Sequence, residues 1–225
     1  MRSEVRILSG AMLLKIFCSG PADTNSVLIG CPDTKQAAVI DAPLGVTPYI
    51  LQAIEKDSLI PQMILLTHSH WDHLADLAPL KKALQIPVYV HAEDAGNVEE
   101  PGSDRLPLFF PIQGVKPDHD LIDGQTLSLG QLKIEVIHTP GHTPGGVCFW
   151  IPQEKIVITG DTLFKGTIGN LSFPTARPSL MWESLKKLAK LPPDTVVIPG
   201  HGSKTSIGTE SWLSQAQKLF GDSFD

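Results

Sequence analysis

The 225-residue sequence has little of several features that define common protein classes. It contains only 3 cysteines, with no CxxC spacing, which argues against a disulfide framework and against a thiolate zinc site. No run of lysine and arginine is longer than two residues and the net charge is −6, so nucleic acid is not an expected partner. The chemistry of this chain must therefore rest on other side chains.

Long apolar runs are also missing. The apolar stretch at residues 11–17 is broken by Lys15 and is too short for a signal peptide or a membrane span. We expect no membrane association and a cytoplasmic protein whose cysteines are free thiols. With 42% apolar residues and a mean hydropathy of +0.05, the chain can bury a substantial core, and we expect one domain over residues 1–225.

Metal-binding side chains crowd into one short segment, THSHWDH, which holds His68, His70, Asp72 and His73. A helix would point His68 and His70 in nearly opposite directions, whereas an extended chain places alternate residues on one side. The apolar residues 63–66 are typical of a buried strand, and the leucines between positions 74 and 84 have helical spacing. We therefore expect a metal site on a strand-to-helix loop.

Three later segments end in further candidate ligands. In IEVIHTPGHTPGG an apolar strand leads into a Pro/Gly loop that carries His142. The strands in KIVITGDTLF and TVVIPGHG end at Asp161 and at His201. Each donor thus lies just past the C-terminal end of a short apolar strand, a recurrence that packing alone does not explain. Imidazole and carboxylate ligands together suit zinc or iron, with manganese as a further option.

The order of these motifs resembles the metallo-β-lactamase superfamily, and most closely its glyoxalase II (hydroxyacylglutathione hydrolase) branch. The match runs from about residue 20 to residue 210. The resemblance implies two divalent metal ions, most simply zinc, with the first held by His68, His70 and His142, the second by Asp72, His73 and His201, and Asp161 bridging them. Asp161 stands where zinc β-lactamases of the main class carry cysteine, which favours a hydrolase of the glyoxalase II kind.

Two adjacent divalent ions of this kind would favour hydrolysis. It would lower the pKa of a bound water from about 16 towards 7. Two cations, the carboxylates of Asp72 and Asp161 and one hydroxide sum to about +1, which suits a developing oxyanion. The sequence therefore predicts a metal-dependent thioesterase in which a hydroxide bridging the ions attacks the acyl carbon of a small-molecule thioester. Asp72 is the expected proton carrier, so Asp72 and Asp161 are the predicted catalytic carboxylates.

Residues with weaker signals are candidates for supporting roles. Asp41, at the end of the strand AAVID, and His138, four residues before His142, are expected to orient ligand histidines. Lys165 and Arg177 follow Asp161 and offer cationic partners for a substrate anion. Residues 99–120 hold four prolines with Leu106, Leu108, Phe109 and Phe110, so this loop either lies over the metals or packs on the core.

The sequence does not identify the thiol or the acyl group of the substrate. Asn170, a further candidate substrate-binding residue, stands where glyoxalase II enzymes usually carry Lys or Arg to hold a glutathione carboxylate. Only 24 residues follow His201, with one expected helix near 209–220, so the C-terminal helical region of those enzymes is truncated. We therefore expect a compact thioesterase rather than a glutathione-specific one.

Other functions share much of this pattern. A persulfide dioxygenase uses one iron held by two histidines and one aspartate, but it usually has Arg after GCG where this chain reads IGN. A lactonase would share the dinuclear centre and open acyl-homoserine lactones instead. A non-catalytic scaffold fits less well, because flavodiiron proteins place Glu where His70 stands. The sequence does not define an oligomeric state.

The fold class follows from an internal repeat. Residues 27–41 and 147–161 both read as β-hairpins, with proline five residues after the first valine and aspartate at the end. Helices expected at 47–57 and 179–191 lead to the strands before His68 and His201. The sequence thus predicts an α/β (α+β) protein, an internally duplicated four-layer αββα sandwich with the site at one edge, which is also the fold that the resemblance implies.

Overall fold

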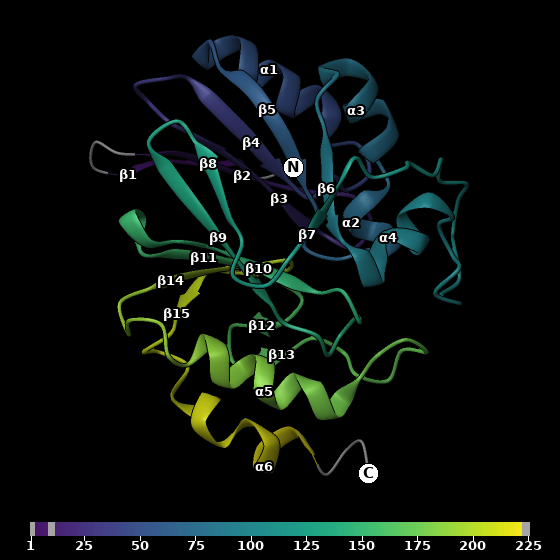
Figure 1. Ribbon diagram of the computed structural model, residues 1–225, viewed down its shortest axis with the longest axis vertical. Coiled ribbons are helices and arrows are strands. Elements are labelled where there is room, and N and C mark those ends of the chain that lie inside the picture. The colour runs from purple at the N-terminus through teal and green to yellow at the C-terminus, as the bar shows by residue number, and fades with distance from the viewer. Residues whose placement is uncertain (1–2, 9–11, 222–225) are drawn as a thin grey trace.

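The computed structural model describes residues 3–8 and 12–221 of the chain. Two β-sheets lie face to face, and helices cover the outer side of each sheet (Figure 1). Helices α1 (Thr47–Asp57) and α3 (Leu77–Leu84) lie on one side, and α5 (Pro178–Leu188) and α6 (Ala216–Phe220) lie on the other. The predicted four-layer αββα sandwich is confirmed. None of the helices in the described ranges has the length and apolarity needed to cross a bilayer.

The first sheet has seven strands in sequence order. They are β1 (Ser3–Leu8), β2 (Met12–Ser19), β3 (Thr24–Gly30), β4 (Gln36–Ile40), β5 (Ile60–Leu65), β6 (Val88–His91) and β7 (His119–Leu121). The pairs from β1 to β4 are antiparallel, and those from β4 to β7 are parallel. The parallel strands end at one edge of the sheet, and β5 leads from there into α2 (Trp71–Leu74).

The second sheet has six strands in the order β15-β14-β11-β10-β9-β8. They are β8 (Thr126–Leu129), β9 (Leu132–His138), β10 (Val147–Ile151), β11 (Ile156–Gly160), β14 (Val196–Pro199) and β15 (Thr205–Ser206). Only the β11–β14 pair is parallel among these described strands. The remaining elements are α4 (Ala92–Glu99), the two-stranded ribbon β12 (Leu163–Phe164) and β13 (Thr167–Ile168), and 3₁₀ turns at Pro152–Glu154 and Ser211–Gln215.

Buried apolar residues form three clusters that correspond to the three interfaces between the four layers. One lies between the sheets and includes Phe149, one joins the first sheet to α1 and α3, and one joins the second sheet to α5. Strands β3, β10 and β11 are buried along their whole length, because each has a core on both of its faces. This explains why polar and apolar residues do not alternate in them: β10 is apolar throughout, and β3 buries Thr24, Asn25 and Ser26 before its apolar residues.

The internal repeat predicted from the sequence is present as an order of elements. The hairpin β3–β4 is followed by α1 and by β5, which pairs with β4 in parallel. The hairpin β10–β11 is followed, after the β12–β13 ribbon, by α5 and by β14, which pairs with β11 in parallel. In each half, the C-terminal ends of a hairpin strand and of the strand parallel to it therefore lie at the same edge of the sandwich.

Two helix predictions were wrong in detail. The helix expected after position 74 is two helices, α2 and α3. The Ala42 N–H donates to the His73 carbonyl, and the Ala42 carbonyl accepts the Asp76 N–H. The Asp76 carboxylate also accepts the Thr47 N–H, at 3.0 Å. These tertiary hydrogen bonds occupy groups that a continuous helix would use. The single helix expected near 209–220 is a 3₁₀ turn followed by α6.

Candidate metal centre

The seven predicted ligands meet at the strand ends of the two sheets. His68 and His70 follow β5, Asp72 and His73 lie in α2, His142 follows β9, Asp161 follows β11, and His201 follows β14. The first four come from the seven-stranded sheet and the last three from the six-stranded sheet. The structure therefore brings together side chains that lie up to 133 positions apart, from 68 to 201.

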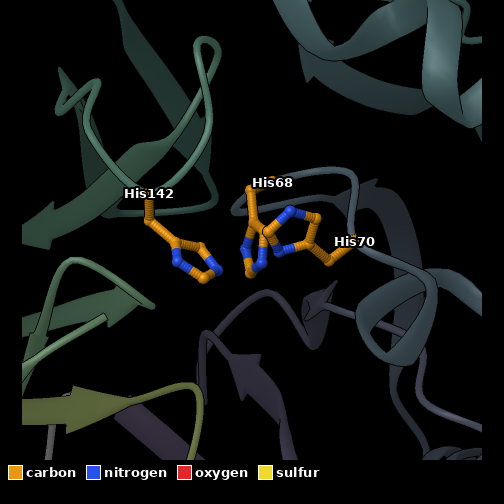
Figure 2. Close-up of side chains that lie close together, drawn as sticks. All are labelled: His68, His70 and His142. Atoms are coloured by element: carbon orange, nitrogen blue, oxygen red, sulfur yellow. The ribbon is translucent and has the colours of Figure 1, made fainter. Parts of the chain in front are cut away.

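Three histidines form the first group. The ring centroids of His68, His70 and His142 lie 4.4 to 5.0 Å apart, and one ring nitrogen from each lies within 4.8 Å of the others (Figure 2). All three side chains are buried, and their Nε2 atoms have no hydrogen-bond partner in the described part of the chain. Buried polar atoms are rarely left unpaired. Three unpaired nitrogens that converge fit a metal ion.

The charge state of this group agrees with that assignment. Burial, followed by the nearby His73, lowers the pKa of His68 well below its usual value. Burial, followed by the nearby His142, lowers the pKa of His70 to about 3. The imidazoles of His68 and His70 are therefore neutral at physiological pH, which is the form that coordinates a metal.

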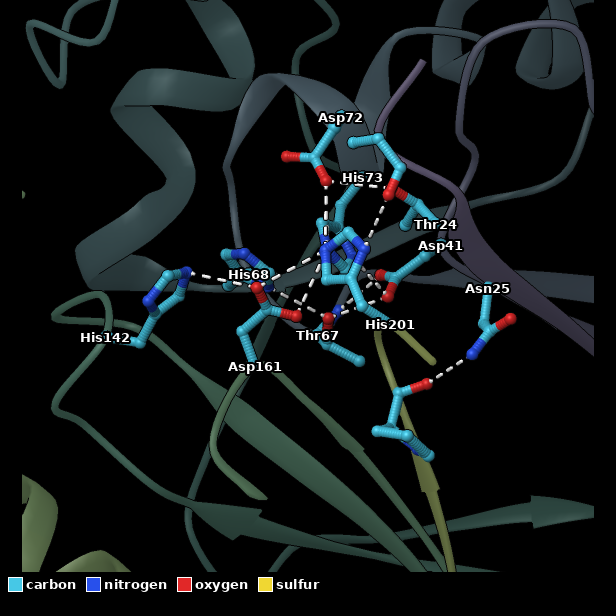
Figure 3. Close-up of polar contacts among 12 residues, drawn as sticks. Thr24, Asn25, Asp41, Thr67, His68, Asp72, His73, His142, Asp161 and His201 are labelled. Atoms are coloured by element: carbon cyan, nitrogen blue, oxygen red, sulfur yellow. Dashed lines mark hydrogen bonds and ion pairs between the residues drawn. The ribbon is translucent and has the colours of Figure 1, made fainter. Parts of the chain in front are cut away.

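The second group consists of Asp72, His73 and His201. The Nε2 atom of His201 lies 3.2 Å from Asp72 Oδ2 and 3.3 Å from His73 Nε2 (Figure 3). Burial disfavours the ionised form of Asp72, but His73 and hydrogen bonds from His201 and Thr24 outweigh it and lower the pKa of Asp72. The group thus combines one carboxylate with two imidazoles, a donor set that suits a second divalent ion.

Asp161 lies between the two groups. Its Oδ2 is 3.4 Å from His142 Nε2 in the first group and 3.4 Å from His201 Nε2 in the second, and its Oδ1 is 3.4 Å from His73 Nε2. Burial opposes ionisation, but His73 and the hydrogen bond from His201 lower the pKa of Asp161 well below its usual value. An ionised carboxylate in this place can bridge two cations.

Hydrogen bonds at the outer ring nitrogens fix four of the ligand histidines, and one of the four is His68, whose Nδ1 lies 3.1 Å from the Thr67 hydroxyl. His73 Nδ1 donates to Asp41 Oδ2 at 2.8 Å, His142 Nδ1 to the Asn170 carbonyl at 2.8 Å, and His201 Nδ1 to the Ala22 carbonyl at 3.0 Å. In each case Nε2 is left to face the centre. Asp41, predicted as an orienting residue, also accepts the backbone N–H of Thr67 at 2.8 Å and its hydroxyl at 2.7 Å.

A glycine is required where the last strand reaches the centre. A Cβ atom on Gly200 would lie 2.2 Å from Asp161 Oδ1 and 2.7 Å from the His73 ring. Real Cβ atoms do not approach other atoms so closely, so the PGHG segment can pass the ligands only without a side chain there.

Asp94 is a functional residue that sequence reasoning missed. It lies in the first turn of α4 and is buried, and its two oxygens accept the Ser69 N–H at 2.9 Å and the Gly145 N–H at 2.7 Å. Ser69 separates His68 from His70, and Gly145 lies in the loop of His142. Asp94 therefore ties together the two segments that form the first group. No local motif marks it, because it acts through distant backbone groups.

The three predicted substrate residues have different surroundings. Lys165 is exposed in the turn between β12 and β13, and Arg177 pairs with Glu93 at 2.9 Å. The side chain of Asn170 is exposed and accepts the Ser172 N–H, so only its carbonyl serves the site, through His142.

His138, the other predicted orienting residue, donates from Nε2 to the Pro144 carbonyl at 3.0 Å, so it supports the loop of His142 rather than the ring itself. His138 also stacks on His91 at 3.9 Å, with Glu93 nearby, and these three side chains form another group of potential ligands. The two rings are nearly parallel, at 12°, so their in-plane lone pairs do not converge. His91 Nδ1 moreover accepts the Glu93 N–H. This group is better explained as structural.

Comparisons with known proteins agree with the geometry. Residues 19–201 match the family model described as the metallo-beta-lactamase superfamily. Hydroxyacylglutathione hydrolase GloC of Haemophilus influenzae is 36% identical over 182 residues, which are 79% of this chain and 85% of that protein. The crystal structure of the BLEG-1 B3 metallo-beta-lactamase is 33% identical, with a TM-score of 0.82, over 92% of this chain and 100% of that one.

The crystal structure of TTHA1623 in a di-iron-bound form is 36% identical, with a TM-score of 0.76, over 87% of this chain and 96% of that one. The residues matched by the family model include all the segments that carry the converging histidines and aspartates. The chain belongs to the metallo-beta-lactamase superfamily.

Proposed function

We propose that this protein is a hydrolase of small-molecule thioesters that works with two divalent metal ions, most simply zinc. The observation that carries the proposal is the position of Asp161, whose carboxylate contacts His142 of one ligand group and both histidines of the other. A site for a single structural ion would not need two converging groups around a shared carboxylate. The ligands would be His68, His70 and His142 for one ion, Asp72, His73 and His201 for the other, and Asp161 for both.

When bound, two such ions supply a nucleophile from water near neutral pH and polarise an acyl oxygen. The protein contributes the geometry around them. Its carboxylates, Asp72 and Asp161, balance only part of a total charge of about +4, which leaves positive charge for an oxyanion. The hydrogen bonds from His73, His142 and His201 to their outer partners hold the rings in place during the reaction.

Asp72 is the residue best placed to move a proton. Its side chain is 13% exposed, whereas that of Asp41 is 2% exposed and shut off behind His73. Its lowered pKa keeps it unprotonated before the reaction. Thr24 donates a hydrogen bond to Asp72 Oδ2 at 2.8 Å and so holds it in position. Asp72 can therefore accept a proton from an attacking water and pass it to a leaving thiolate.

Two kinds of observation support the proposed substrate class, one from a similar protein and one from the residues near the site. The similarity to a hydroxyacylglutathione hydrolase of Haemophilus influenzae supports thioesters, and aspartate rather than cysteine at position 161 agrees with it. The pairing of Arg177 with Glu93 and the exposed, neutral Asn170 speak against recognition of a glutathione carboxylate. We therefore propose thioesters of simpler thiols.

The test begins with purified protein, in which zinc, iron and manganese are counted per chain. Hydrolysis is then measured for S-lactoylglutathione, simpler thioesters, an acyl-homoserine lactone and a β-lactam, with oxygen consumption on glutathione persulfide. We expect two ions and thioester hydrolysis. One iron with oxygen consumption would establish the dioxygenase instead, and preferred opening of a lactone or a β-lactam would overturn the assignment to thioesters.

A pair of variants tests the shared carboxylate. Asp161→Ala should remove one metal equivalent and most of the turnover. Asp194→Ala is the matched control, because Asp194 is an exposed surface residue paired with Lys155. Full activity and two bound ions in Asp161→Ala would refute the dinuclear mechanism.

A further inference from the structure

Aromatic side chains border the metal centre although they make up only 6% of the chain. Trp71 lies between the ligands His70 and Asp72, at the start of α2. The rings of Phe109 and Phe110 lie 5.4 and 5.7 Å from the Trp71 ring, both in edge-on orientation. Phe109 is 73% exposed, which is unusual for so large an apolar side chain. Phe109 and Phe110 therefore extend an apolar surface outward from the ligand segment.

Another aromatic ring reaches the centre from the second half of the chain. Phe173, in the loop between β13 and α5, has its ring 5.3 Å from that of His70 and 5.5 Å from that of His142. It is partly exposed. The segment of Phe173 and that of Phe109 both lie on the side of the molecule where α2 is found, beside the ends of the strands (Figure 1). Phe173 thus places apolar surface directly beside the first ligand group, while Phe109 lies beside Trp71, the residue between the ligands His70 and Asp72.

The loop that carries Phe109 is anchored to the metal ligands. Asn97 donates a hydrogen bond to the Ser69 carbonyl at 2.7 Å, between His68 and His70. The Oδ1 atom of the same side chain accepts the N–H groups of Gly102 and Asp104 at 3.0 and 3.2 Å. Asn97 is almost fully buried, so these bonds are shielded from water. The start of the aromatic loop is therefore held in a fixed position relative to the ligands.

Charge near Phe173 is already compensated. Arg177, the cation of the same loop, forms an ion pair with Glu93 of α4 at 2.9 Å. A substrate carboxylate would have to compete with Glu93 for this guanidinium. An apolar group meets no such competition, and it would cover aromatic surface that is now exposed to water.

We propose that Trp71, Phe109, Phe110 and Phe173 form a binding site for an apolar acyl group, aryl or medium-chain alkyl, of the substrate. The inference rests on the proposed hydrolase function, since the acyl carbon must lie at the metal ions. It assigns the selectivity of the enzyme to the acyl side of the scissile bond and to aromatic contacts rather than to ion pairs.

The first experiment varies the acyl group and keeps the thiol constant. Acetyl, hexanoyl and phenylacetyl thioesters of N-acetylcysteamine are compared on the zinc-loaded protein. We expect kcat/KM for the phenylacetyl ester to exceed that for the acetyl ester by about tenfold or more. Phe109→Ala should lower the phenylacetyl value by about fivefold and the acetyl value by less than about twofold. Phe173→Ala should act in the same direction.

Ile122→Ala is the matched control, since Ile122 is 65% exposed and lies beyond β7 rather than in the aromatic loop. It should leave both values unchanged. Equal kcat/KM for all three acyl groups, or an equal loss for all three in Phe109→Ala, would overturn the proposal while leaving thioester hydrolysis intact.

A binding measurement separates this proposal from the proposed function. The thioether of N-acetylcysteamine that carries a 2-phenylethyl group cannot be hydrolysed, and its Kd is measured by calorimetry. We expect Phe109→Ala to weaken its binding about fivefold, and Ile122→Ala to leave it unchanged. Binding of this kind in a protein that hydrolyses no thioester would refute the function and keep the apolar site. Absence of binding to the unaltered protein would refute the site.

Discussion

Replacing Asp41 by asparagine is expected to weaken the binding of the second metal ion selectively. Asp41 Oδ2 accepts the His73 Nδ1–H at 2.8 Å and the Thr67 hydroxyl at 2.7 Å, and Oδ1 accepts the Thr67 N–H at 2.8 Å. Asparagine retains one acceptor oxygen. If that oxygen keeps the Thr67 N–H, the amide NH₂ faces the His73 N–H, and two donors oppose each other. The His73 ring then loses the partner that fixes its tautomer.

The size of the effect follows from the role of such partners. Loss of a group that orients a ligand histidine costs about 10- to 100-fold in metal affinity, which corresponds to about 1.4 to 2.7 kcal/mol. The backbone should tolerate the change, because Asp41 has a φ of 60° and asparagine adopts this left-handed conformation readily. The first ion should lose less affinity than the second, since Asp41 reaches the first ligand group only through the Thr67 hydroxyl, which lies 3.1 Å from His68 Nδ1.

The assay is a competition titration with a chromophoric zinc chelator, which yields the two affinities separately, together with circular dichroism to confirm folding. Asp118→Asn is the matched control, because Asp118 also accepts a backbone N–H, from Val88 at 2.8 Å, but on the surface beside Lys81. It should leave both affinities unchanged. If Asp41→Asn retains both affinities within about twofold, Asp41 does not orient His73 in the way described.

Three further predictions concern pH, metal removal and loop packing. Burial lowers the pKa of His201, but hydrogen bonds to Asp161 and Asp72 outweigh it and raise the pKa to about 9 in the metal-free protein. Burial likewise lowers the pKa of His73, but the nearby Asp72, Asp41 and Asp161 outweigh it and raise the pKa well above its usual value. The second ion must therefore displace two protons, and its affinity should rise more than about tenfold per pH unit from pH 6 to 8; a flat profile in calorimetric titrations would contradict this. Removing the ions with a chelator should lower the melting temperature, since free zinc at 100 times its Kd adds about 2.7 kcal/mol to the free energy of unfolding; an unchanged melting temperature would refute the ligand set. Gly145→Ala should destabilise the protein by about 1 to 3 kcal/mol in denaturant titrations and weaken the first ion. Its Cβ would lie 2.7 Å from the Asp94 carboxylate, whereas a Cβ on Gly96 in α4 meets nothing within 4 Å, so Gly96→Ala should not destabilise.

The part of this molecule that could be predicted from sequence is the part encoded locally. Each ligand lies shortly after the end of an apolar strand. The ligand positions can therefore be recognised from four local motifs, HxHxDH, TPGHT, GDTLF and PGHG. The layers follow from the same runs, because strands that are apolar throughout must be buried on both faces. Local patterns were therefore enough to predict the αββα fold.

What could not be predicted depends on contacts between distant segments. Asp94 and Asn97 bond to the backbone of Ser69, 25 and 28 positions away, and nothing in their own segment marks them. The ion pair between Arg177 and Glu93 of α4 joins positions 84 residues apart, and neither local segment indicates it. The break between α2 and α3 likewise arises from tertiary hydrogen bonds at Ala42 and Asp76, which leucine spacing does not reveal.

The division of the ligands between the two sheets makes the metal centre sensitive to the middle of the sandwich. One sheet supplies four donors and the other supplies three, so the separation of the sheets sets the distance between donors of the same ligand group that come from different sheets. That separation is determined by the side chains packed between the sheets, among them Phe149, which is fully buried. A volume change at such a position would alter coordination geometry from a distance. Substitutions in this inner layer are therefore expected to adjust the proposed activity although they change none of the ligands.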